Sequence, residues 1–167
     1  PCRGGADVHR ALLRTLFASF ALLPELAGVR AIVVCDGYKL AKPGGKLKLK
    51  GGIVSPTIAE GYAATLSWLR AELQRGAAWL SAQRVELLEL PEWRGWSSAV
   101  EHALRLVETP HVMVIQDDRC FTKRFGQLLP LLAAMRAREG EVGYVLLPTR
   151  KQRDYVATMR SLAGRHG

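Results

Sequence analysis

Acidic side chains stand directly after two of the most apolar stretches of this chain. Asp36 follows the β-branched run 29–35, and the pair Asp117-Asp118 follows the run 111–116. An unpaired carboxylate inside a core costs too much free energy, so we expect these acids at the solvent end of each stretch. Carboxylate oxygens, together with substrate phosphates, are the ligands that Mg²⁺ and Mn²⁺ prefer. The alternative interpretation of Asp117-Asp118 is a solvated acidic turn.

Short apolar runs alternate along the chain with segments of helical periodicity. Strands are predicted over residues 29–35, 84–90, 111–116 and 142–147, and helices over 8–20, 56–73, about 97–107 and 127–138, with a helical start to the tail 151–167. An apolar strand without polar alternation is typical of a buried parallel strand. The alternation of strands with helices therefore predicts an α/β domain with a mainly parallel sheet flanked by helices. In such sheets, ligands bind at the carboxyl ends of the strands, where the acids would lie.

Three of the helices have a capping signal at their start. Asp7 precedes the first helical stretch, and Ser55 precedes the second, with Pro56 in the first helical position. Ser97 or Ser98 would cap the third, beside a glycine turn. Free N–H groups at that helix start favour an anion.

The charge of the chain favours anionic partners without choosing among them. The sequence of 167 residues has 24 Lys and Arg against 15 Asp and Glu, a net charge of +9. Nucleic acid, membrane surfaces and phosphorylated small molecules all fit that surplus. Residues 39–50 hold five lysines and no acid, but lack the residue order of a phosphate-binding loop. A solvated basic loop is the default interpretation, and a module that binds RNA or an anionic surface is the alternative.

Length and apolar content predict a single domain over residues 1–167. No apolar run approaches the roughly 20 residues that a membrane span needs, so we expect no membrane segment in this chain. Because Pro1 opens the chain without a Met, we expect a fragment of a longer protein. Cys2, Cys35 and Cys120 show neither metal-ligand spacing nor a disulfide framework. Both a secretory-pathway (Golgi) and a cytoplasmic location stay open.

The order of three segments resembles a known family. Residues 32–37, then 95–100, then 112–118 are similar to the nucleotide-sugar-binding half of a GT-A glycosyltransferase, closest to the family 2 type. The resemblance covers about residues 6–147. It implies a Rossmann-like nucleotide-diphospho-sugar transferase fold and transfer of a sugar from a nucleoside diphosphate to an acceptor. It also implies a divalent cation, Mn²⁺ or Mg²⁺, as cofactor.

The resemblance assigns roles to individual residues. Asp36 would accept a hydrogen bond from the nucleotide base or ribose, and Arg94 would pair with phosphate. Asp118 matches the last acid of the family's Asp-x-Asp motif and would bind the metal, while Asp117 would lie near the ribose or the metal. Gln116 stands where the first acid is usual, and an amide is a weaker ligand than a carboxylate.

Two departures from the family pattern bear on activity. Only residues 1–5 precede the opening helix, so we expect the family's first strand to be missing. The chain also ends soon after the last predicted strand, so the catalytic base is expected outside it and no catalytic residue is assigned. The alternatives are a sugar nucleotidyltransferase and a basic, non-enzymatic module for RNA or another anion. We expect no nucleic-acid partner, because no aromatic residue interleaves with the lysines.

Overall fold

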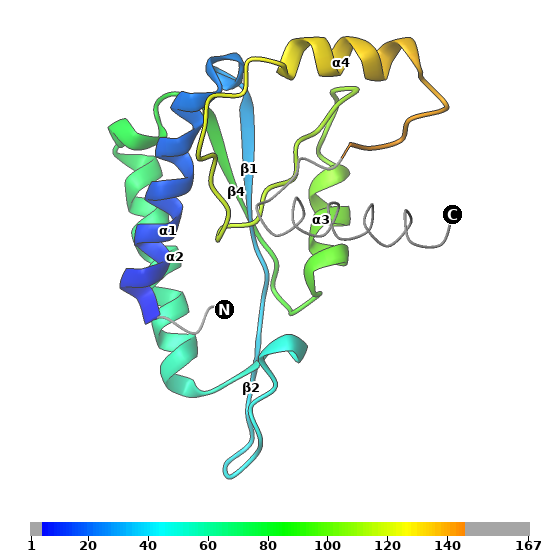
Figure 1. Cartoon of the computed structure of the whole chain (residues 1–167). Helices are drawn as coiled ribbons and strands as arrows, with labels where there is room; N and C mark the ends of the chain where they lie inside the picture. The colour runs from blue at the N-terminus through cyan, green and yellow to red at the C-terminus, as the bar shows by residue number, and fades with distance from the viewer. Residues whose placement is uncertain (1–4, 146–167) are drawn as a thin grey trace, which may run out of the picture. The chain divides into compact units, whose positions relative to one another are not determined.

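The structure is a computed structural model that describes residues 5–145, in two compact units, residues 1–128 and 129–167. The helices and strands are α1 (Gly5–Ser19), β1 (Arg30–Cys35), β2 (Lys39–Leu40), β3 (Ile53–Val54), α2 (Pro56–Gln74), β4 (Arg84–Glu89), α3 (Trp96–Leu104) and α4 (Leu128–Ala137) (Figure 1). Short 3₁₀ turns cover Phe20–Leu22, Pro24–Leu26, Leu49–Gly51 and Ala78–Leu80. The predicted α/β class is confirmed in this form, as a small parallel sheet with helices.

The described part of the first unit has two small parallel sheets, one formed by β2 and β3 and a longer one formed by β1 and β4. Strands β1 and β4 pair in parallel, from Arg30 opposite Arg84 to Cys35 opposite Glu89. The N–H of Leu90 donates to the Cys35 carbonyl at 2.9 Å, which extends the ladder past the end of β4. Both predicted strands, 29–35 and 84–90, are thereby confirmed. The parallel pairing places the carboxyl ends of the two strands side by side.

Helices α1 and α2 lie next to each other and supply much of the core (Figure 1). Leu16 and Phe17 of α1 and Leu69 of α2 are buried. The start of α2 is as predicted, because the Ser55 hydroxyl accepts the Ile58 N–H at 3.3 Å and Pro56 is the first helical residue. Removing apolar surface from water in this way is the main force that holds these helices on the sheet.

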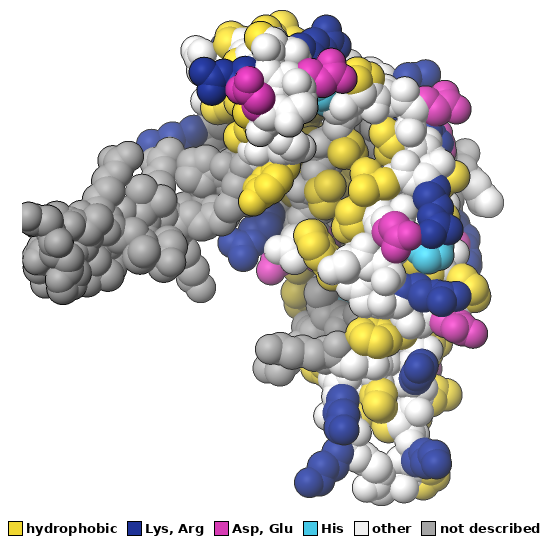
Figure 2. Space-filling view, turned by 90° about the vertical axis from the view of Figure 1, so that its right-hand side faces the viewer, with side chains coloured by type: hydrophobic (Ala, Val, Ile, Leu, Met, Phe, Trp, Pro, Cys, Tyr) yellow, Lys and Arg dark blue, Asp and Glu magenta, His cyan; other side chains and the backbone are white. Residues whose placement is uncertain are grey.

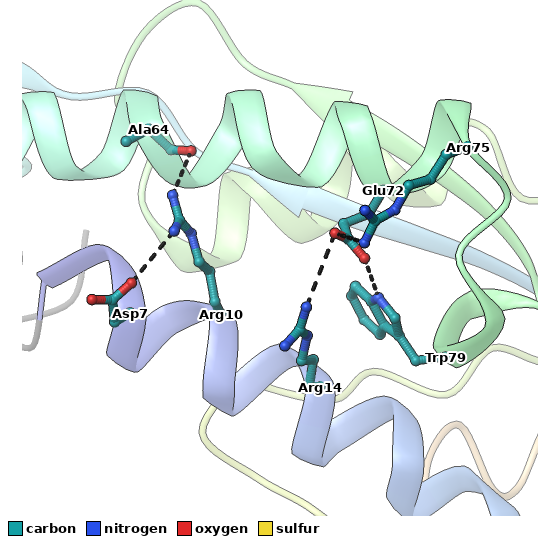
Figure 3. A network of polar contacts seen from close by, with 7 residues as sticks. All are labelled: Asp7, Arg10, Arg14, Ala64, Glu72, Arg75 and Trp79. Atoms are coloured by element: carbon teal, nitrogen blue, oxygen red, sulfur yellow. Dashed lines mark hydrogen bonds and ion pairs between the residues drawn. The ribbon is translucent and has the colours of Figure 1, made fainter.

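A buried carboxylate fastens α2 to its neighbours. The side chain of Glu72 is 3% exposed and accepts hydrogen bonds from Arg75 and from Trp79 Nε1, the latter at 2.5 Å. Arg14 reaches the same carboxylate from α1 at 4.0 Å (Figure 3). The hydrogen bond from Arg75 is the main reason that the pKa of Glu72 lies below its usual value. Trp68 stacks on Trp79 with ring centres 5.5 Å apart, so these two indoles serve packing.

Two helix starts differ from the predictions. Helix α1 already begins at Gly5, so Asp7 lies in its first turn and is not its cap. Helix α3 begins at Trp96 and is preceded by Gly95, with φ of +78°, instead of by Ser97 or Ser98. Glycine takes this left-handed conformation without steric cost, so the chain turns into the helix one step earlier than the serines suggest.

The predicted strand 111–116 is wrong, because these residues belong to no strand in the structure. Their burial alternates: Val112, Val114 and Gln116 are exposed, and the three residues between and before them are half-buried. β-branched residues fit a pleated, half-buried surface, but a strand also needs a neighbour for its backbone groups, and residues 111–116 pair with neither β1 nor β4.

The last predicted strand, 142–147, is likewise absent where it is described. Residues 142–145 are irregular, and residues 146–147 and the tail 151–167 lie outside the described residues. The helix predicted over 127–138 is confirmed as α4. No helix within residues 5–145 is long and apolar enough to cross a membrane.

Candidate ligand site at the carboxyl end of the sheet

Asp36 leaves the end of β1 and bridges to the turn before α3. Its Oδ1 accepts the backbone N–H of Arg94 and its Oδ2 that of Gly95, each at 2.8 Å. The Tyr62 hydroxyl, from α2, donates to the backbone carbonyl of Asp36 at 2.7 Å. The residue is therefore tied to the two segments that flank it at this edge of the sheet. Charge-assisted bonds of this kind are among the stronger hydrogen bonds in proteins.

Glycines let these segments approach one another closely. A Cβ on Gly37 would lie 2.3 Å from the backbone carbon of Glu92. A Cβ on Gly52, whose φ is +69°, would lie 2.1 Å from the Trp93 ring. Any larger residue at either position would force the turn 92–95 away from the end of β1. The two glycines thus hold that turn where Asp36 can receive its N–H groups.

An open pocket of about 330 Å³ lies beside this bridge, at the carboxyl ends of β1 and β4. Its walls are Cys35, Asp36, Gly37, Tyr38, Tyr62, Leu66, Glu89, Leu90 and Pro91. Tyr38 and Tyr62 meet edge to face, with ring centres 5.8 Å apart. The volume is at the small end of the range for ligand pockets, and aromatic walls with a few polar groups are typical of such sites.

The ionisation of the pocket residues limits their chemistry. Burial is the main cause that raises the pKa of the Cys35 thiol to about 11. Burial also raises the pKa of Tyr62. Both groups are therefore neutral at pH 7, and Cys35 is no thiolate nucleophile there. Glu89 forms a two-pronged ion pair with Arg70, in which Nε and Oε1 are 2.7 Å apart. The pocket has two carboxylates in its walls, and each already accepts two hydrogen bonds: that of Glu89 from the Arg70 guanidinium, and that of Asp36 from backbone N–H groups.

Asp117 lies near the same end of the sheet as Asp36. Its charge acts on the pKa values of both His9, in α1, and Cys35, at the end of β1. The following segment then returns to the far end of α1, where the Phe121 N–H donates to Ser19 Oγ at 3.1 Å. Asp117 thus lies within electrostatic range of the last residue of β1, although residues 111–116 form no strand.

Asp118, the next residue, is largely exposed to solvent. Its side chain is 60% exposed and lies 3.5 Å from Arg119 Nε. Within residues 5–145, no group of three or more His, Cys, Asp or Glu side chains could hold a metal ion by itself. Two adjacent carboxylates nevertheless suit a Mg²⁺ or Mn²⁺ ion whose remaining ligands are water and substrate phosphates. Asp117 and Asp118 would supply the protein's share of such a shell.

Arg94 contributes to the bridge through its backbone. Its N–H is bonded to Asp36, while its exposed guanidinium lies 3.9 Å from Glu92. A loosely paired arginine at this edge is available to an anion. Of the two tryptophans in the turn, Trp93 packs on Gly52, and Trp96 is largely exposed.

Tyr38, Tyr62 and Glu89 line the pocket but were not predicted from the sequence as members of the site. Tyr62 fits the apolar stripe of α2, so its periodicity indicates only a core position. One signal was present, because a half-buried tyrosine usually finds a hydrogen-bond partner for its hydroxyl. Its partner is the Asp36 carbonyl, 26 positions away in the chain.

A scan against protein-family models matches none of them, and searches of curated proteins and of solved structures find no match either. The class that the fold defines is an α/β unit with a pocket at the carboxyl ends of two parallel strands.

Proposed function

We propose that this chain is a donor-binding domain of a glycosyltransferase of the GT-A type. It would bind a nucleoside diphosphate sugar at the carboxyl end of the β1–β4 pair, with Mn²⁺ or Mg²⁺ as cofactor. The observation that carries the proposal is that Asp36 and the aromatic pocket lie together at this edge, with the charge of Asp117 close enough to raise the pKa of Cys35. Ligands of open parallel sheets bind at the same place.

Asp36 retains the capacity to bind a nucleoside. A carboxylate offers about four acceptor positions, and the N–H groups of Arg94 and Gly95 take two of them. The others remain for the N–H of a base or a ribose hydroxyl. Because both existing donors are backbone groups, the carboxylate is held in place before any ligand arrives, and this lowers the entropy cost of binding.

The charged groups near the pocket suit the diphosphate. The Arg94 guanidinium would pair with a phosphate, and Asp117 and Asp118 would hold the cation. The bound cation supplies stabilisation of the negative charge that develops on the departing diphosphate. The residues themselves bind and orient the donor. None of them is assigned as the catalytic base, and the acceptor and the sugar are not identified.

Calorimetric titration with UDP and GDP, each with and without Mn²⁺, tests the proposal. We expect metal-dependent binding to one of them, weakened at least about tenfold by Asp118→Asn, because the amide keeps the shape but not the charge. Asp117→Asn should weaken it less. The matched control is Glu60→Gln, an exposed acid on α2, which should leave the affinity unchanged.

Arg94→Gln separates the phosphate role from the nucleoside role. It should weaken binding of the diphosphate by about tenfold and binding of the free nucleoside hardly at all. Absence of metal-dependent binding to either nucleotide by the folded parent protein would contradict the proposal.

A further inference from the structure

The loop between β2 and β3 projects a cluster of unpaired cations. Lys39, Lys42, Lys46 and Lys48 are all exposed, and none of them forms an ion pair with a described acid. The sequence has no Asp or Glu from residue 37 to residue 59. Figure 2 shows the dark-blue side chains around the lower projection of the molecule. The positive charge of this loop is therefore not compensated locally.

Aliphatic side chains lie exposed among these lysines. Leu40 is 59% exposed and Leu47 is 50% exposed. Figure 2 shows yellow side chains between the blue ones on the same projection. Exposed single leucines are common on protein surfaces, but here two of them share a short loop with four exposed cations. That combination is suited to a partner that is both anionic and apolar.

The backbone of the loop is fixed at its base and at its tip. The Lys39 N–H donates to the Gly52 carbonyl, and the Ala41 N–H to the Val54 carbonyl, both at 2.8 Å. At the tip, the Gly45 N–H donates to the Lys42 carbonyl at 2.8 Å, in a turn where Gly44 has φ of +70°. The lysines and leucines are consequently presented from a hydrogen-bonded scaffold.

We propose that the segment 39–50 docks on an anionic lipid surface. The lysines would face the negative headgroups, and Leu40 and Leu47 would enter the interface between headgroups and acyl chains. Juxtamembrane lysines and shallowly inserted aliphatic side chains bind membranes by this combination. RNA fits the loop less well, because residues 39–52 include no aromatic side chain on which a base could stack. The inference does not depend on the proposed donor site.

Sedimentation with lipid vesicles tests the charge component. We expect the chain to bind vesicles of phosphatidylcholine with about a third phosphatidylserine, and not vesicles of phosphatidylcholine alone. The double variant Lys42→Glu with Lys46→Glu should lower the affinity at least about tenfold. The control pair Lys123→Glu with Arg124→Glu makes the same change in net charge outside the loop and should retain binding. Equal losses in the two double variants would overturn the proposal.

A second pair of variants tests the apolar component and separates lipid from RNA. Leu40→Ser with Leu47→Ser should lower the affinity for the anionic vesicles about tenfold, whereas Leu104→Ser with Leu106→Ser, exposed positions elsewhere, should not. The same variants are titrated with poly-uridylate at the same salt concentration. Unchanged vesicle binding by the loop serine variant, or tighter binding of the parent to the RNA than to the vesicles, would overturn lipid docking. Circular dichroism confirms that each variant is folded.

Discussion

The segment 30–36 and the segment 111–118 are both apolar runs that end in acids. In the first, β1 pairs along its length with β4, and Asp36 is bonded to two backbone N–H groups beyond it. In the second, the backbone joins no strand, and Asp118 is exposed beside Arg119. The contrast shows that composition makes a segment suitable for a sheet, while a neighbouring strand makes it part of one.

Asp36 and Asp118 differ in their hydrogen-bond partners for the same reason. Asp36 has donors because the turn 92–95 is held against the end of β1 by the close approach at Gly37 and Gly52. Asp118 follows a segment without such a partner, so solvent and a neighbouring arginine are its surroundings. Asp36 therefore has a structural role as well as any role in binding, whereas Asp118 has no comparable structural role.

The largest difference between the segments should appear in amide exchange. The Leu90 N–H, bonded to the Cys35 carbonyl, should exchange at least about a hundredfold more slowly than the Val114 N–H. Only alternate amides of β1 should be slow, because a parallel strand directs every second N–H toward a given neighbour. Exchange followed by NMR or mass spectrometry measures this. Comparable protection across residues 112–116 would show that this segment is paired in solution.

Thiol labelling should distinguish the two cysteines nearly as strongly. Burial raises the pKa of Cys35 to about 11, so roughly one thiol in a thousand is ionised at pH 8. Cys120 is exposed. In a Cys2→Ser background, Cys120 should react with iodoacetamide about a hundredfold faster than Cys35. Peptide mapping of the labelled sites reads out the rates, and equal rates would mean that the end of β1 opens readily.

Replacing Asp36 or Asp118 by alanine should change the free energy of unfolding by different amounts. Asp36→Ala should lower the free energy of unfolding by about 2 kcal/mol, because two backbone N–H groups lose a charged acceptor. Asp118→Ala should change it by less than about 0.5 kcal/mol, as is usual for exposed sites. Urea denaturation followed by circular dichroism compares them. A large loss in the Asp118 variant would assign that acid a structural role.

The smallest effect is the coupling of Asp117 to His9. Burial lowers the pKa of His9 below 6.5, and the Asp117 charge opposes that shift. Because the folded pKa is the lower one, the contribution of His9 to stability is complete above 6.5 and is lost as the pH falls through its folded value. Asp117→Asn should lower the His9 pKa by a few tenths of a unit in an NMR titration. If Asp118→Asn lowered the His9 pKa more than Asp117→Asn does, Asp118 and not Asp117 would be the acid nearer to His9.

Local sequence patterns predicted correctly those elements whose formation depends on residues nearby in the chain. Apolar runs located β1 and β4, and Ser55 with Pro56 located the start of α2. The segment 111–116 shows their limit, because its composition is strand-like and its pairing depends on distant residues. Among the predicted site residues, Asp36 lies at the end of β1 as expected, but its hydrogen-bond partners lie 58 and 59 positions away and leave no local signal.

The Asp36 hydrogen bonds join residues far apart in the sequence, and this also bears on the order of folding. Closing a span of 58 or 59 residues carries an entropy cost that only prior structure can offset. The bridge should accordingly form after α2 has packed on α1 and after β4 has met β1. By the same logic it should open before the paired strands do, as a local fluctuation that frees the turn 92–95 while β1 and β4 stay paired. The pocket wall that contains Asp36 would then fold later than the β1–β4 pair and loosen earlier.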